Sequence, residues 1–75
     1  GGMTPFFPRL YIAQRAADHG VTVEQLHSKS RSPKLVDARA QIARELSARN
    51  MSQHRIAALL NRDRTMIIHY MRRAG

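Results

Sequence analysis

Two segments of the sequence concentrate side chains that can bind phosphates and read the edges of nucleotide bases. In residues 28–33, Ser-Lys-Ser-Arg-Ser-Pro, Lys29 and Arg31 alternate with serines and no aliphatic or aromatic residue is present. Residues 62–66 read Arg-Asp-Arg-Thr-Met. Arginine pairs with guanine through two hydrogen bonds, and the methyl group of Thr or Met can contact the thymine methyl. These residue types therefore predict DNA contacts, with phosphates bound by the first segment and bases read by the second.

The expected contact residues are cations, polar side chains and one methionine from these two segments and their surroundings. They are Lys29, Arg31, Ser32, Lys34, Arg55, Arg62, Asp63, Arg64, Thr65, Met66, His69, Arg72 and Arg73.

The charge distribution favours a polyanionic partner. The chain has a formal net charge of +8, and all of the excess lies in residues 28–75 because the charges of residues 1–27 cancel. Concentrated positive charge is the electrostatic footprint of a nucleic-acid partner, since each neutralised phosphate releases a condensed counterion. Charge alone is also compatible with an ordinary solvated surface, so the prediction needs the elements that carry these residues.

The N-terminal half is expected to form two helices before the basic loop. Apolar residues in the segment Pro8–His19, among them Leu10, suit one helical face, and Gly20 can supply a left-handed stop. Thr22 and Gln25 have the spacing of a capping box, which would open a short helix that runs through His27. Residues 28–33 then form the loop.

The longest expected helix follows, with Ser32 as its N-cap and Pro33 in its first turn. It runs to about Asn50, and its apolar residues recur at spacings of three and four. These residues are Leu35, Ala38, Ile42 and Leu46.

Residues 53–72 have the pattern of a helix-turn-helix. A first helix capped by Ser52 carries the small residue Ala57 where two helices must approach closely, and Asn61 tolerates the left-handed turn. A second helix, capped by Asp63, is expected over residues 64–73. Ile67, Ile68 and Met71 would face the core, which leaves Arg64, Thr65 and Met66 outward at the tip that a recognition helix presents to the major groove.

The stretch Arg62–His69 resembles the DNA-binding domain of the bacterial replication initiator DnaA, whose signature is Gly-Arg-Asp-His-Thr-Thr-Val-Leu-His. Upstream, Val23–Leu26 followed by Ser28–Ser32 is similar to that family's short helix and basic loop, usually Ser-Lys-x-Arg-Ser. The resemblance covers about residues 10–74. Arg64 replaces the family's His, Met66 replaces its second Thr, and Asn61 stands in for a pair of glycines.

The resemblance implies an all-α, Trp-repressor-like bundle of four to five helices with two DNA contacts. The recognition helix would lie in the major groove, and the basic loop would lie on the minor groove or its phosphates. No glycine-rich phosphate loop accompanies the domain. With Gly1 and Gly2 taken as the remainder of an expression tag and Met3 as the native start, residues 3–75 would be a stand-alone or N-terminal module without the ATPase, from a bacterium or phage.

Other functions have weaker support. No histidine pairs with another His or a Cys at helical i, i+4 spacing, and no nucleophile and base have a catalytic spacing, so neither a metal, a cofactor nor enzymatic activity is expected. No apolar run reaches the roughly 20 residues of a membrane span, and a cytoplasmic regulator of transcription or replication is expected. The rival is a protein-interaction or dimerisation module with only non-specific DNA affinity, for which Phe6, Phe7 and Tyr11 would form the contact unless they pack on the bundle.

Overall fold

The structure is a computed structural model that describes residues 5–73, and every element of this range is a helix. The elements are α1 (Pro8–Asp18), α2 (Val23–His27), α3 (Pro33–Ala48), α4 (Gln53–Leu60) and α5 (Arg64–Arg72). The expected all-α bundle is thus confirmed. The expected native start at Met3 and the two glycines before it lie outside the described residues.

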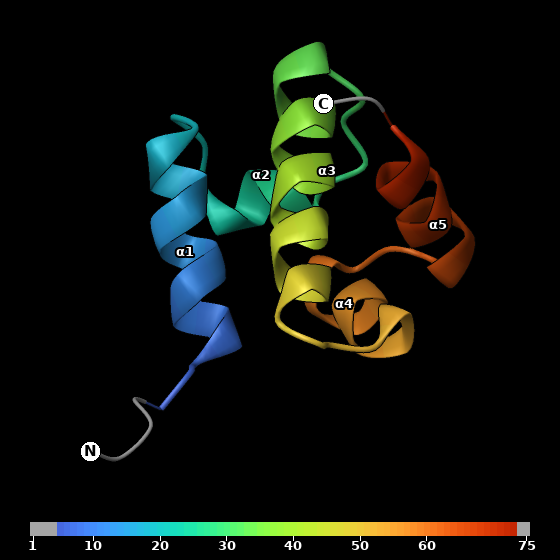
Figure 1. Cartoon of the computed structure of the whole chain (residues 1–75). Coiled ribbons are helices and arrows are strands. Elements are labelled where there is room, and N and C mark those ends of the chain that lie inside the picture. The colour runs from blue at the N-terminus through green and yellow to red at the C-terminus, as the bar shows by residue number, and fades with distance from the viewer. Residues whose placement is uncertain (1–4, 74–75) are drawn as a thin grey trace.

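Helix α3 is the centre of the bundle. It packs against each of the other four helices, with α1 on one side of it, α5 on the other and α4 across one end (Figure 1). Its buried face carries the expected Leu35, Ala38, Ile42 and Leu46. A side chain on the buried face of α3 therefore lies within reach of several elements that are distant in sequence.

Local capping explains where the helices begin. The Thr22 hydroxyl accepts a hydrogen bond from the Gln25 amide at 3.0 Å, and the Gln25 side chain accepts one from the Thr22 amide at 2.9 Å. Ser32 and Ser52 accept from the amides three residues ahead, at 3.4 and 3.2 Å. Three of the four expected caps are confirmed, whereas the Asp63 side chain makes no capping hydrogen bond to α5. Each of the three satisfies a donor that the first helical turn leaves free.

Left-handed residues explain where helices end. Gly20 has φ +71° and Asn61 has φ +57°, as expected for the stops after α1 and α4, and Asn50 has φ +66° after α3. Glycine and asparagine are the residues that adopt this conformation most readily. The helices end one or two residues before the expected positions, at Asp18, Ala48 and Arg72.

Two expectations about the core were wrong. Leu10 is 68% exposed, because it lies two residues from the buried Ile12 and therefore on the opposite side of α1. In α5, Ile67 is buried and Met71 packs against the core, as expected, but the second large buried residue is Tyr70, and Ile68 is only half-buried. Ile67 and Tyr70 are three residues apart, so they share the face that α5 turns to the bundle.

A polar cluster fastens α1 to α3. Arg15 donates to both carboxylate oxygens of Glu45, from Nε at 2.9 Å and from Nη2 at 2.8 Å, and the Tyr11 hydroxyl donates to Oε1 at 2.7 Å. The hydrogen bonds from Arg15 are the main cause of a lowered pKa of Glu45. Burial, together with the bond to Glu45, raises the pKa of Tyr11. The charged form of Glu45 is thus the form that this cluster stabilises.

We expect Glu45→Gln to reduce the dependence of stability on acid pH. Because folding lowers the pKa of Glu45, the unfolded chain binds more protons in acid, so this carboxylate stabilises the fold above its unfolded pKa of roughly 4.3 and that contribution disappears as the pH falls below this value. Urea unfolding between neutral pH and pH about 3 measures the effect. At neutral pH the variant should lose about 1 kcal/mol, since the cluster is partly exposed.

The matched control is Glu24→Gln, a change at an exposed glutamate of α2 that forms no ion pair within residues 5–73. It should keep the acid slope of the wild type. An unchanged slope in Glu45→Gln would contradict the assigned role of Glu45.

Candidate nucleic-acid interface

The basic loop between α2 and α3 is ordered by its own serines. The Ser28 hydroxyl donates to the Gln25 carbonyl at 2.6 Å and accepts from the Ser30 amide at 3.3 Å, and the Ser30 hydroxyl accepts from the Ser32 amide at 3.4 Å. Such local bonds from serine to the backbone two residues on are typical of turns. Lys29 and Arg31, which alternate with the serines, are exposed.

Arg39 of α3 holds the inner side of this loop. Its side chain is 1% exposed, and its guanidinium donates to four backbone carbonyls. The acceptors are Leu26 at 2.8 Å, Ser30 at 2.6 Å, Gln25 at 3.0 Å and Ser28 at 2.9 Å. Burial lowers the pKa of Arg39, and the charge of Arg62 lowers it further. A guanidinium has five N–H donors in a rigid fork, which suits carbonyls that converge from α2 (Gln25 and Leu26) and from the loop (Ser28 and Ser30).

The turn between α4 and α5 forms hydrogen bonds to the start of the same loop. Arg62 donates to the carbonyl oxygens of Ser28, of Asn61 at 2.8 Å and, more weakly, of His27 at 3.5 Å. The side-chain Nδ2 of Asn61 donates to the His27 carbonyl at 3.2 Å, and His27 Nε2 donates to the Leu59 carbonyl at 2.8 Å. Arg62, which the sequence predicts as a phosphate contact, therefore uses its guanidinium on the protein backbone.

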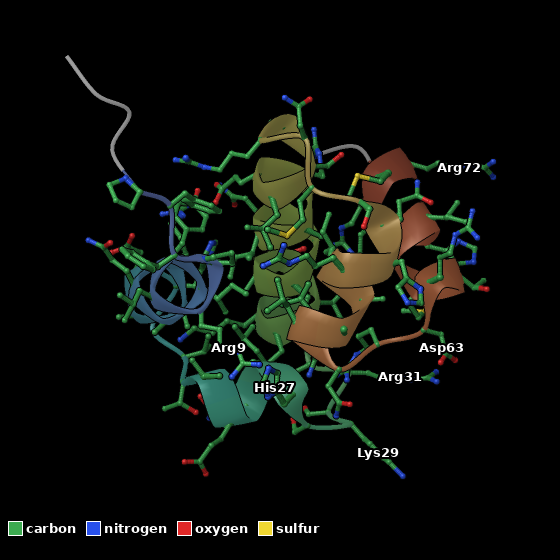
Figure 2. All side chains as sticks on the ribbon, turned by 90° about the horizontal axis from the view of Figure 1, so that it is seen from below. Arg9, His27, Lys29, Arg31, Asp63 and Arg72 are labelled. Carbon is green, nitrogen blue, oxygen red and sulfur yellow. The ribbon has the colours of Figure 1, made fainter. Side chains whose placement is uncertain are left out.

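The first turn of α5 lies beside the loop and is turned outward. Arg64, Thr65 and Met66 are exposed, as expected from the inward position of Ile67. Asp63 occupies the N-cap position, but its side chain makes no capping hydrogen bond. Its carboxylate points outward (Figure 2).

A groove of about 390 Å³ separates the loop from α5. Four cations line it, namely Lys29, Arg31, Arg39 and Arg62, together with Met66 and Tyr70 of α5. Lys29, Arg31, Asp63 and Arg72 project toward the same side of the molecule (Figure 2). The loop, the groove and the outer face of α5 therefore form one continuous surface, which we call the loop–α5 face.

Several predicted contact residues have other positions or partners. Arg55 lies against α1, beside Pro8 and Leu10, away from the loop–α5 face. Lys34 extends toward Gly20, where an added Cβ would lie 3.1 Å from Nζ. Arg73 pairs with Asp37 of α3, whereas Ser32 caps α3. Of the remaining predicted residues, His69 and Arg72 are exposed on α5.

Sequence reasoning missed the structural roles of Arg39 and Tyr70. A signal for Arg39 is present, because it precedes Ile42 by three residues and Leu46 by seven and therefore lies on the buried face of α3. No sequence pattern announces its partners, since they are backbone carbonyls up to 14 residues away.

The described residues also bear on metal binding and membrane insertion. Residues 5–73 hold no group of three or more His, Cys, Asp or Glu side chains placed to bind a metal. In the same range, no helix has the length and apolar composition needed to cross a membrane.

We expect Arg39→Met to destabilise the protein by about 2–3 kcal/mol, because it leaves the loop carbonyls without their donors. Arg39→Lys should recover only part of this loss, since one ammonium cannot span four acceptors. Urea unfolding provides the measurement. The control is Arg44→Met on the exposed side of α3, where the arginine makes a single 3.3 Å bond to the Arg73 carbonyl. Equal stability of the two methionine variants would contradict the role of Arg39.

Comparison with known proteins gives no match for this chain among family models, curated proteins or solved structures. The resemblance to the DNA-binding domain of DnaA stays a prediction that depends on its two sequence motifs.

Proposed function

We propose that this chain binds double-stranded DNA with the loop–α5 face and reads its sequence through the first turn of α5. One observation supports this most: Arg39 and Arg62 fix the basic loop beside α5, with Lys29 and Arg31 exposed on the same side as the tip of α5. Two DNA contacts that are separated by more than 30 residues would thus be presented together, as a single rigid surface.

The residues of this face suit the two grooves of B-form DNA. An α-helix fits the major groove, where Arg64 would pair with guanine and the methyl groups of Thr65 and Met66 would contact thymine. Asp63 does not cap α5 and would accept from the amino group of cytosine. Lys29 and Arg31 would bind the adjacent minor groove or its phosphates.

The proposed role is that of a transcription or replication regulator that acts on DNA in a bacterial or phage-infected cytoplasm. Arg64 and Met66 stand where the DnaA signature has His and Thr, so the proposed target differs from that family's origin sequence. The second candidate, a protein-interaction module with only non-specific DNA affinity, is favoured by the exposure of Phe7 and Leu10. Phe6, by contrast, packs against Tyr11 and under Arg49, with 5.5 Å between the two ring centroids.

Selection from random duplex oligonucleotides at a stated salt concentration would supply the target site for the test. We expect Arg64→Ala to weaken binding to that site by about 1–3 kcal/mol and to relax the preference at one base pair. Lys29→Ala and Arg31→Ala should instead weaken binding to all duplexes and each reduce the slope of log affinity against log salt by about 1. Fluorescence anisotropy with specific and random duplexes measures both effects.

Arg9→Ala is the matched control, because Arg9 is an exposed cation of α1 outside the loop–α5 face (Figure 2). This variant should keep the preference for the selected DNA sequence over random duplexes. If Arg64→Ala kept both affinity and sequence preference, sequence reading by α5 would be excluded. If Arg9→Ala weakened binding as much as Lys29→Ala, the basic loop would not be a distinct DNA contact and only diffuse attraction would remain.

A further inference from the structure

A second surface, apart from the loop–α5 face, exposes apolar side chains. Phe7 is 59% exposed and Leu10 is 68% exposed at the start of α1. They line a hollow of about 500 Å³ together with Ala58 and Leu59 of α4. Solvent-exposed side chains of this size, gathered at one hollow, indicate an interaction site.

The hollow continues into a second one along α1. This neighbour, of about 350 Å³, is lined by Ile12, Val23 and His27, and it shares Arg9, Ala58 and Leu59 with the first. Helices α1 and α4 both pack on α3, and the space between them stays open as one groove, which we call the α1–α4 groove. It shares no lining residue with the groove between the loop and α5.

Charge indicates what this groove would bind. Arg9 and Arg55 line it, none of its lining residues is acidic, and neither arginine has an ion-pair partner within residues 5–73. A second copy of the chain would bring another net charge of +8 to the groove, which opposes self-association. An apolar channel with cations on its rim instead complements an amphipathic helix whose polar face is acidic.

We propose that the α1–α4 groove docks an acidic amphipathic helix of a partner protein. Apolar side chains one turn apart on that helix would enter the two hollows against Leu10 and Leu59, and its carboxylates would pair with Arg9 and Arg55. The docked partner and bound DNA would occupy different faces, so the domain would join a partner to its DNA site. The docking itself does not depend on the proposed DNA binding.

The test uses a designed, fluorescein-labelled peptide with leucines at i, i+3, i+4 and i+7 and glutamates on the remaining face. Its control is a peptide of the same composition with the leucines scrambled around the helix. Fluorescence anisotropy without DNA should detect binding of the ordered peptide and at least about tenfold weaker binding of the scrambled one, a difference of roughly 1.4 kcal/mol.

Variants of the protein locate the bound peptide. Leu10→Glu and Arg9→Glu should each weaken binding at least about tenfold, whereas Arg72→Glu, an equal charge change on the loop–α5 face, should have little effect. Leu10 and Arg9 are exposed, so both variants should fold, and circular dichroism checks this. No binding of the ordered peptide, equal binding of the scrambled one, or equal losses for Arg9→Glu and Arg72→Glu would overturn the proposal.

Light scattering tests whether a second copy of the chain occupies the α1–α4 groove. We expect a monomer mass at all concentrations. A dimer that Leu10→Glu dissociates would mean that a second copy covers the groove, and would overturn the proposal of an acidic partner. Because these assays contain no DNA, their failure and a failure of sequence reading by α5 are separate results.

Discussion

The hydrogen bonds from the buried Arg39 guanidinium to α2 and the basic loop are the interaction on which this structure depends. A buried cation is costly unless its donors are satisfied, and here four carbonyls satisfy them in place of a carboxylate. The loop meets this demand with the carbonyls of Ser28 and Ser30 turned toward Arg39. The need to satisfy one buried arginine thereby favours this conformation of the basic loop, which has no hydrophobic anchor of its own.

Contacts within the fold determine which cations are free to act on a partner. Arg39 and Arg62 are used within the fold, Arg73 pairs with Asp37, and Arg49 stacks on the rings of Phe6 and Tyr11. The cations of residues 28–75, where the sequence concentrates the excess positive charge, therefore have different roles. Some stabilise the fold, and others remain exposed. The exposed cations Lys29, Arg31, Arg64 and Arg72 lie on the loop–α5 face. A basic composition alone would not have separated these two groups.

Features with a local cause were predictable from the sequence, and features with a distant cause were not. Thr22, Ser32 and Ser52 cap their helices because each bond joins groups three residues apart, and Asn61 ends α4 through its own backbone preference. The outward position of Arg64 followed from helical periodicity. Arg62, in contrast, was predicted to bind a phosphate because it is a cation in the turn before α5. It instead donates to the carbonyls of His27 and Ser28, which are distant in sequence. Tyr70 was missed because its polar hydroxyl obscures a mainly apolar ring.

Chemical-shift mapping of the isotope-labelled protein with a selected duplex tests the central claim most directly, since it reports each backbone amide separately. If the loop–α5 face is the DNA-binding surface, amide signals of residues 28–32 and 62–69 should shift together at one stoichiometry, while those of α1 stay in place. Shifts confined to α1 and α4, or spread over all basic residues alike, would contradict it.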